Sequence, residues 1–359
     1  MRILIATDAW RPQVNGVVRS LESMARAAGA MGAQFDFVTP RDFNCMPMPT
    51  YPEIDLALAT PRAMRRRFDA NCDHVHIATE GPVGLAARAC CLRDRRCFTT
   101  SYHTRFPEYI HARAGVPLVV TYAMLRWFHN AGGGTMVSTQ SLSRELLARG
   151  FKRTLRWSRG VDHTTFNPAA AIPLDFPRPI FLYAGRLAVE KNLDAFLSLD
   201  LPGTKLVAGD GPARRRLEAR YSDARFLGVK TAAELATLYA SCDAFVFPSR
   251  TDTFGMVLLE AMACGAPVAA FPTPGPLDVV GASGAGVLDE DLRAAALKAL
   301  TIDREIARAH ALTFTWENSA RQFLENISVA RGAPLFGEKP LPLPGEQNAT
   351  GLSKMGLPI

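Results

Sequence analysis

Short β-rich runs alternate with helical stretches along most of this 359-residue chain, and this alternation restricts its fold more than any other feature. Helical spacing of apolar residues is clear in the stretch after Asn15-Gly16. Near-continuous apolar runs that are joined by helices predict a parallel sheet covered on both faces. In the first half, the runs that we interpret as strands are residues 3–7, 35–39, 75–79, 97–102 and 135–139.

The pattern starts again after a proline-rich bridge at residues 168–179. Because 359 residues exceed what one core usually holds, we predict the α/β class with two Rossmann-like parallel-sheet domains that face each other across a cleft. The strands predicted for the second half are 180–184, 205–208, 224–227, 244–247 and 268–271. The predicted parts are a first domain at 1–168, a second at 169–314, a helix at 315–331 that crosses back to the first domain, and a flexible tail at 332–359.

Composition excludes several classes of protein. Hydrophobic residues make up 48% of the chain and charged residues 21%, which is typical of a soluble globular protein. No apolar run is long enough for a membrane span, and residues 1–6 lead into Asp8 as a strand would, not as a signal peptide. The seven cysteines include no Cys-x-x-Cys pair and no histidine at ligand spacing, so neither a disulfide framework nor a zinc site is indicated. We therefore expect a cytoplasmic protein.

Positive charge is concentrated in the first half of the chain. Residues 1–170 hold 22 Lys and Arg against 13 Asp and Glu, whereas residues 171–359 hold 19 against 21. Basic and apolar residues alternate in one cluster, which fits either an anionic phospholipid surface or an ordinary solvated face. The asymmetry favours a surface partner, and no motif supports nucleic acid. The residues that we assign to membrane contact are Arg62, Arg65, Arg66, Arg67, Phe68 and Trp127.

The stretch 247–268 predicts a strand, a glycine-containing turn, a helix and a second strand, with two carboxylates at a fixed spacing. Asp252 lies in the turn, and Glu260 follows eight residues later on an otherwise apolar helix. Burial of an unpaired carboxylate costs several kcal/mol. A ligand that donates hydroxyl groups would compensate this cost, so the two acids predict a polyol site near a helix N-terminus.

Two cations follow the strand predicted at 180–184. Arg186 lies in the turn after Gly185, and Lys191 lies near the start of the next helix, so both can converge on a phosphate at the end of the strand. A planar guanidinium and a mobile ammonium suit a diphosphate whose charge grows as its bond to a sugar breaks. The alternative is that both residues are ordinary surface cations.

Two features of the first domain point to the same cleft. Gly16, after Asn15, allows close approach of backbone to a ligand at a helix N-terminus that attracts negative charge, although a plain turn also explains it. His103 follows the strand at 97–102, and residues at the carboxyl end of a parallel strand face the crevice. The other six histidines are interpreted as structural.

Taken in order, these motifs resemble the retaining glycosyltransferases of family 4, which have the two-Rossmann architecture called GT-B. The resemblance covers residues 1–330. Within the family, the chain looks most like the branch of alpha-mannosyltransferases and diacylglycerol glycosyltransferases that includes sulfoquinovosyl-diacylglycerol synthases. It departs from the family at Asp252, where Glu is more common, and at Asn15, where a paired glycine is common. The motifs are Asn15-Gly16, 101–104, 185–192, 209–212 and 247–268.

The resemblance implies a role for each matching residue. Glu260 would hold the ribose hydroxyls of a nucleotide, Asp252 the hydroxyls of the transferred sugar, and His103 the region around C6 of that sugar. The residues expected to act in catalysis are His103, Arg186, Lys191 and Asp252. Those expected to bind the donor are Asn15, Gly16, Gly185, Arg186, Lys191, Gly209, Asp210, Val229, Asp252, Phe254, Gly255, Met256, Val257 and Glu260; for 209–211, a tight-turn role is equally consistent.

No metal or other cofactor is expected. Asp289 and Asp291 have the spacing of a metal-binding Asp-x-Asp, but they precede a predicted helix at 292–300, where acids cap the helix. Phosphate charge would instead be balanced by Arg186, Lys191 and helix N-termini.

The predicted function is transfer of a hexose, such as glucose, glucuronate or mannose, from a nucleotide diphosphate sugar to a lipid acceptor. Diacylglycerol is the acceptor that we favour, at the inner face of the cytoplasmic membrane. The alternative within the class is a GDP-mannose-dependent alpha-mannosyltransferase that acts on a phosphatidylinositol-type, soluble or oligosaccharide acceptor. Outside the class, a sugar phosphorylase or a nucleotide-sugar epimerase shares the architecture.

Overall fold

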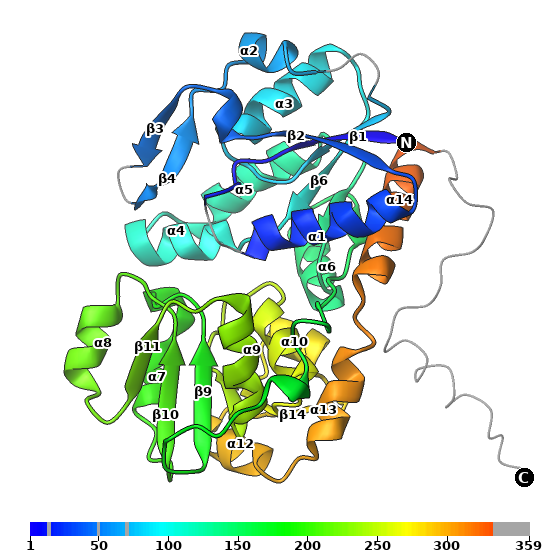
Figure 1. The fold of residues 1–359 in the computed structure, drawn as a ribbon. Coiled ribbons are helices and arrows are strands. Elements are labelled where there is room, and N and C mark those ends of the chain that lie inside the picture. Colours follow the sequence, from blue (N-terminus) through cyan, green and yellow to red (C-terminus); the bar gives the residue numbers. More distant parts are fainter. Residues whose placement is uncertain (13–15, 49–50, 69–71, 333–359) are drawn as a thin grey trace, which may run out of the picture.

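A computed structural model describes residues 1–12, 16–48, 51–68 and 72–332 of the chain, and these form two α/β domains, one above the other in Figure 1. The first domain is built on a six-stranded parallel sheet with the order β2-β1-β5-β6-β7-β8. Its strands are β1 (Arg2–Ala6), β2 (Gln34–Val38), β5 (His74–Ile77), β6 (Phe98–Tyr102), β7 (Thr135–Val137) and β8 (Thr154–Arg156).

The second domain is built on another six-stranded parallel sheet, with the order β11-β10-β9-β12-β13-β14. This is the strand order of dinucleotide-binding Rossmann domains. The two parallel α/β sheets therefore confirm the predicted fold class. The strands are β9 (Ile180–Ala184), β10 (Thr204–Ala208), β11 (Arg225–Gly228), β12 (Ala244–Phe247), β13 (Val268–Ala270) and β14 (Gly286–Leu288).

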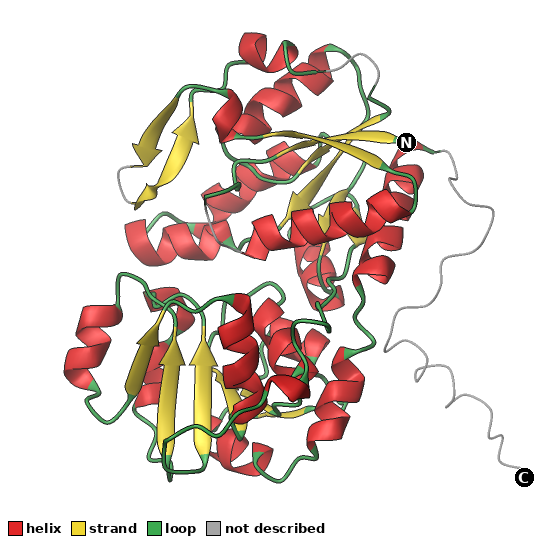
Figure 2. Ribbon diagram, in the orientation of Figure 1, coloured by secondary structure: helices red, strands yellow, loops and turns green. Residues whose placement is uncertain are grey.

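Helices cover both faces of each sheet (Figure 2). Alternate residues of a strand point to opposite faces, so Ile180 and Leu182 pack into one apolar cluster and Phe181 and Tyr183 into the other. The helices of the first domain are α1 (Gly16–Ala30), α2 (Pro61–Arg65), α3 (Pro82–Arg93), α4 (Phe106–Ala114), α5 (Leu118–His129) and α6 (Gln140–Ala148). Those that follow are α7 (Leu193–Leu197), α8 (Arg214–Arg220), α9 (Ala232–Ser241), α10 (Met256–Ala263), α11 (Pro274–Val279), α12 (Leu292–Ala299), α13 (Arg304–Ala311) and α14 (Trp316–Arg331).

The last helix, α14, leaves the second domain and packs beside α1 of the first domain (Figure 1). Phe323, Leu324 and Ile327 are buried there in the same cluster as Ile3 and Ile5 of β1. The connection from α13 to α14 therefore joins the two domains a second time, in addition to the chain segment between β8 and β9.

The structure also contains strands that the sequence pattern did not predict. One is an antiparallel hairpin of β3 (Cys45–Met48) and β4 (Tyr51–Ala57). Its prolines and charged residues interrupt the sequence pattern that is typical of strands. The edge strands β8 and β14 are short and only partly buried, so they lack the apolar run that marks the equally short, fully buried strands β7 and β13. None of the described helices is both long enough and apolar enough to cross a membrane.

Neighbouring strands β9 and β12 form the switch point of the second sheet, because successive strands run outward from this pair in opposite directions. Ligands of open α/β sheets bind beyond the carboxyl ends of the strands at such a point. The loop after β9 carries Arg186 and Lys191, and the loop after β12 carries Asp252. The topology therefore brings together residues that lie 61 positions apart in sequence.

Candidate active site

Lys191 and Asp252 form an ion pair at the switch point of the second sheet. The short 3-10 helix Val189–Lys191 ends with Lys191, whose Nζ donates to Asp252 Oδ1 at 2.6 Å. Burial lowers the pKa of the Lys191 ammonium, but Asp252, Tyr109 and Tyr183 together outweigh burial and the net pKa lies above its ordinary value. Lys191 is therefore a cation at neutral pH.

Asp252 has a second oxygen that no protein group satisfies. Its Oδ2 is buried, and no donor among the described residues lies within hydrogen-bond distance of it. Buried polar atoms nearly always have a partner, so an unpartnered carboxylate oxygen indicates a donor supplied by a ligand. Asp252 thus offers one oxygen to Lys191 and the other to a hydroxyl or similar group.

Glu260 lies on α10 with 3% of its surface exposed, and its two oxygens have different partners. Arg19 Nη1, from α1 of the first domain, donates to Oε1 at 3.2 Å, and the Tyr239 hydroxyl donates to Oε2 at 3.4 Å. Burial raises the pKa of Glu260, and Arg19 and Tyr239 oppose this rise without cancelling it. The carboxylate that the sequence places on an apolar helix is therefore held by the opposite domain.

The N-termini of α1 and α10 approach each other across the boundary between the domains. A Cβ atom added to Gly16, the first residue of α1, would lie 4.0 Å from the Met256 side chain at the start of α10. Gly255 precedes α10 with a φ of 85°, a left-handed conformation that only glycine adopts without strain. Helix N-termini carry partial positive charge and unpaired backbone N–H groups, so together they favour an anion between them.

The loops after β9 and β10 pack so closely that glycine is required at their contact. A Cβ atom on Gly209 would lie 1.9 Å from the carbonyl oxygen of Gly185, and the Leu187 amide donates to the Asp210 carbonyl at 2.9 Å. The Asp210 carboxylate pairs with Arg214 at 3.1 Å. This contact supports the tight-turn interpretation of residues 209–211. The exposed Arg186 lies in the loop that this turn supports.

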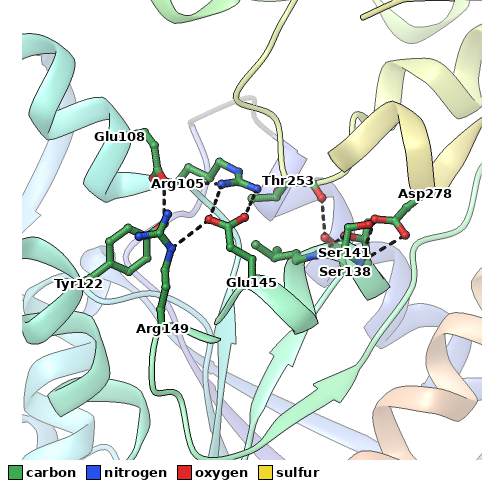
Figure 3. A network of polar contacts seen from close by, with 11 residues as sticks. Arg105, Glu108, Tyr122, Ser138, Ser141, Glu145, Arg149, Thr253 and Asp278 are labelled. Atoms are coloured by element: carbon green, nitrogen blue, oxygen red, sulfur yellow. Dashed lines mark hydrogen bonds and ion pairs between the residues drawn. The ribbon is translucent and has the colours of Figure 1, made fainter. Parts of the chain in front are cut away.

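His103 touches the loop of Asp252 from the first domain. The Thr253 hydroxyl donates to the His103 carbonyl oxygen at 2.8 Å, and the Ser138 hydroxyl donates to the Thr253 carbonyl at 3.0 Å. Figure 3 shows Thr253 and Asp278 from the second domain reaching Ser138 and Ser141 of the first. The Ser141 amide donates to both carboxylate oxygens of Asp278, at 3.1 and 3.3 Å.

A polar network fixes the chain directly after His103. Arg105 is 7% exposed and binds both oxygens of Glu145 on α6, at 3.1 and 2.7 Å, and Glu108 lies 3.6 Å away (Figure 3). Burial raises the pKa of Glu145, but Arg105 and Arg149 together outweigh burial and the net pKa is lowered. The Tyr122 hydroxyl donates to Glu108 at 2.7 Å, so the network ties α4, α5 and α6 together. Its groups neutralise one another, which indicates a supporting role.

Comparison with known sequences identifies the chain. A profile described as Glycosyltransferase Family 4 matches residues 14–165, and one described as Glycosyl transferases group 1 matches residues 178–303. A GDP-mannose-dependent alpha-mannosyltransferase of Mycolicibacterium smegmatis is 31% identical over 320 residues, which cover 80% of this chain and 84% of the relative. The chain belongs to glycosyltransferase family 4.

Two further relatives of this family 4 glycosyltransferase lie in the branch that its motifs predict. The sulfoquinovosyl transferase SQD2 of Arabidopsis thaliana is 31% identical over 298 residues, 74% of this chain and 58% of the relative. The alpha-monoglucosyldiacylglycerol synthase of Streptococcus pneumoniae is 25% identical over 378 residues, 91% of this chain and 84% of the relative. The predicted family and branch are confirmed.

The solved structure of a sucrose-phosphate synthase from Thermosynechococcus elongatus superposes on the family 4 glycosyltransferase with a TM-score of 0.72. The sequences are 19% identical, and the superposition covers 90% of this chain and 97% of the other. This similarity shows a shared fold, and it confirms the GT-B architecture that the motifs predict.

Several residues of the site in this family 4 glycosyltransferase were not singled out from its sequence. Two lie in the first domain, one in the segment between β8 and β9, and two in the second domain; Thr253 falls inside the motif at 247–268 without a role assigned to it, and no motif marks the others. Arg19 is recognisable only as a cation on the α1 face that also holds Gly16. The residues are Arg19, Ser138, Arg159, Thr253 and Asp278.

The remaining predicted residues lie in an outer loop of the second domain or outside the described ranges. Val229 is 75% exposed in the loop after β11, two strands away from β9. Asn15 falls outside the described residues, as does most of the predicted tail from 333 onward. The described ranges hold no group of three or more His, Cys, Asp and Glu side chains arranged to bind a metal. Asp291 caps α12, as its sequence context predicts, by accepting from the amides of Arg293 and Ala294.

The basic cluster on α2 lies far from the switch point in sequence and in the fold. The four arginines there are exposed, whereas Phe68 is half-buried against the core of the first domain. Arg67 forms an ion pair with Asp42 at 3.2 Å. Trp127 on α5 is 56% exposed and lies under the guanidinium of Arg88 at 3.7 Å.

Proposed function

We propose that this family 4 glycosyltransferase transfers a hexose from a nucleotide diphosphate sugar to a lipid acceptor, with retention of the anomeric configuration. The observation that carries the proposal is the unpartnered Oδ2 of Asp252. Lys191 holds the other oxygen, Oδ1, at the switch point, and the next residue, Thr253, contacts His103. A sugar hydroxyl supplies the missing donor there. The two helix N-termini beside it suit the diphosphate of the same substrate.

The diphosphate of the donor would lie between the start of α1 and the start of α10, with Arg186 and Lys191 beside it. Negative charge grows on this group as its bond to the sugar breaks, and preorganised cations and N–H groups stabilise that charge. The nucleotide ribose would take Glu260 as its acceptor, and the base would lie toward the ends of β10 and β11. The proposed contacts with the donor therefore come from the second domain and from the start of α1 in the first domain.

In the proposed reaction, the acceptor hydroxyl attacks the anomeric carbon on the face from which the phosphate leaves. The new carbon–oxygen bond forms as the carbon–phosphate oxygen bond breaks, and the hydroxyl proton passes to the departing phosphate oxygen. This route requires no protein nucleophile. It agrees with the roles given to the two carboxylates, because Asp252 is paired with Lys191 and offers its other oxygen to a sugar hydroxyl, and Glu260 is paired with Arg19.

A lipid acceptor is supported by the surface of the first domain. Val120, Met124 and Trp127 recur at helical spacing on one face of α5, and all are more than half exposed. Val119 beside them is 69% exposed, and Phe106 and Ile110 are exposed on α4. This domain also carries the positive charge of the chain, so it suits an anionic membrane surface. The pneumococcal relative is an alpha-monoglucosyldiacylglycerol synthase, which agrees with this acceptor class.

A second candidate is GDP-mannose-dependent transfer to a soluble or phosphatidylinositol-type acceptor. It is favoured by the name of the relative from Mycolicibacterium smegmatis, of which this chain spans 84%. Asp252 has a shorter side chain than the Glu that is more common in the family, and this difference changes the contacts of the sugar rather than those of the nucleotide.

A panel of UDP and GDP sugars tests both candidates. Each donor is incubated with the full chain and with liposomes that contain diacylglycerol and anionic lipid, and in parallel with soluble sugars, and labelled products are separated by phase. We expect one donor to label the lipid phase. Product in the aqueous phase alone contradicts the lipid acceptor, and no product with any donor contradicts the proposed transfer. Anomeric configuration of the product, read by NMR, tests retention.

A further inference from the structure

Arg159 is a buried cation whose contacts include no carboxylate in the described part of the chain. It is 4% exposed and lies in the segment after β8, where Nη1 donates to the carbonyl oxygens of Trp157 at 2.6 Å and Ser158 at 3.2 Å. Its guanidinium stacks 4.0 Å from the centre of the Trp157 ring. Burial lowers the pKa of Arg159 to about 9, so it remains protonated at neutral pH. A buried charge without a counter-ion is costly, which indicates a use for it.

The surroundings hold Arg159 in one position. Trp157 is fully buried, and its indole N–H donates to the Ser319 hydroxyl on α14 at 3.0 Å. Ser319 in turn donates to the Ser158 carbonyl at 2.8 Å. The Arg159 guanidinium therefore stacks on the Trp157 ring, and a hydrogen bond from that ring to α14 fixes its position.

The remaining contact of Arg159 determines which ring nitrogen of His103 carries the proton. Arg159 Nη2 lies 3.2 Å from His103 Nδ1. A guanidinium only donates hydrogen bonds, so Nδ1 must be the acceptor and the ring proton must be on Nε2. The imidazolium form would place a second cation and a second donor against Arg159. Burial, followed by Arg159, holds the pKa of His103 well below its ordinary value, which agrees with the neutral ring.

The Nε2–H group of His103 is buried and has no acceptor among the described residues. Two other buried histidines are satisfied at both nitrogens: His76 by Thr99 and Ser101, and His129 by Thr100 and Glu80. His103 differs from them because it lies where the two domains meet, next to the loop of Asp252. An unpartnered donor in that place indicates an acceptor oxygen on a ligand.

We propose that Arg159 is a positioning residue, which fixes His103 as the neutral Nε2–H tautomer and so presents a hydrogen-bond donor to an oxygen of the transferred sugar. The proposal rests on the proposed function for the identity of the ligand, but the tautomer is a property of the protein alone. The titratable groups that face His103 are Arg159, His76 from β5 and His129 from α5, and neither histidine contacts Nδ1.

The first test is ¹⁵N NMR of histidine-labelled protein without any substrate, with the His103 signal assigned from a His103→Asn variant. We expect the Nε2–H tautomer in the wild type from pH 8 to pH 5.5. In Arg159→Met, we expect mixed tautomers and a His103 pKa that is higher than in the wild type but still below its ordinary value, because the ring stays buried. A wild-type Nδ1–H tautomer overturns the proposal, as does an unchanged tautomer in Arg159→Met. If that variant fails to fold, the wild-type tautomer and the Arg159→Lys variant still test the proposal.

The second test is the pH profile of transfer with the donor found in the panel. We expect Arg159→Met to lose roughly ten- to a hundredfold in kcat, by analogy with the loss found when a group that orients a metal-bound histidine is removed. We also expect activity of this variant to be lost at a higher pH on acidification than activity of the wild type, and Arg159→Lys to restore the wild-type profile in part. Arg153→Met, an exposed substitution next to the same strand, is the control. A uniform loss at every pH indicates a structural role and contradicts the proposal.

Failure of this inference is distinguishable from failure of the proposed function. Absence of transfer by the wild type with any donor contradicts the function and leaves the NMR result standing. Transfer with an unchanged pH profile and tautomer in Arg159→Met contradicts the inference and leaves the function standing.

Discussion

Arg19 of α1 and Glu260 of α10 meet across the boundary between the two domains, with Nη1 of the guanidinium 3.2 Å from Oε1 of the carboxylate. The carboxylate is almost fully buried, whereas 39% of the Arg19 side chain is exposed. Glu260 is also the residue that we assign to the nucleotide ribose. A single carboxylate therefore connects closure of the domains with binding of the donor, and the two roles can be tested separately.

Replacement of Glu260 by Gln is expected to weaken binding of UDP or GDP, whichever the enzyme uses. A ribose diol then loses a charged acceptor, which costs about 1.5–3 kcal/mol, or roughly 10- to 100-fold in Kd. Gln has nearly the same shape, so the helix should keep its packing. Isothermal titration calorimetry with both nucleotides measures the effect, and the exposed Glu305→Gln is the control. Unchanged affinity in Glu260→Gln shows that the ribose binds elsewhere.

Replacement of Arg19 by Met is expected to destabilise the protein increasingly as pH rises. Burial raises the pKa of Glu260 above its ordinary value of 4.5, and Arg19 limits that rise. The folded state of the variant therefore holds the proton to higher pH than the unfolded state, and its stability falls as pH increases above the unfolded pKa. We expect a loss of about 1–3 kcal/mol at pH 8 and a smaller loss at pH 5.

Urea unfolding at the two pH values measures this difference. Arg26→Met, an exposed substitution on the same helix, is the matched control and should show the same stability as the wild type at both. A loss in Arg19→Met that is equal at pH 5 and pH 8 means that Glu260 is not the group that Arg19 serves.

Replacement of Asp252 by Asn is expected to lower kcat strongly while nucleotide affinity stays within about twofold. The substitution removes the ion pair with Lys191 and the acceptor that we assign to a sugar hydroxyl, and interactions specific to the reacting sugar appear in kcat. A loss of roughly 100-fold corresponds to about 2.7 kcal/mol of transition-state stabilisation. Transfer kinetics and UDP or GDP titrations check the two halves of the prediction. Asp289→Asn, in an exposed loop, serves as the control.

Replacement of Met124 by Glu is expected to weaken binding to anionic vesicles by roughly tenfold or more, because a charge then enters the apolar face of α5. Turnover of a short-chain soluble acceptor should not change. Ile306→Glu places the same charge on an exposed apolar residue of α13 in the second domain and should leave vesicle binding intact. Vesicle sedimentation measures both variants. Equal loss in the two variants indicates a general effect of charge.

Much of the architecture was accessible from the sequence because buried parallel strands have an unambiguous pattern. The runs at 3–7 and 180–184 lie within one residue of β1 and β9. The edge strands β8 and β14 and the hairpin β3–β4 were not predicted, because partly buried edge strands lack a continuous apolar run and proline obscures a strand. The Lys191–Asp252 pair was not predicted as a pair, although each residue was singled out.

The sequence by itself determined two Rossmann-like halves, the family, and the residues that follow β9 and β12, because these depend on local periodicity and on spacing along one chain segment. Only the tertiary structure decided which groups face one another. Arg19 reaches Glu260, Arg159 reaches His103 and Thr253 reaches the His103 carbonyl, each between residues at least 56 positions apart. Such pairs form because folding brings the ends of parallel strands and the two domain edges together, and no local pattern records that contact.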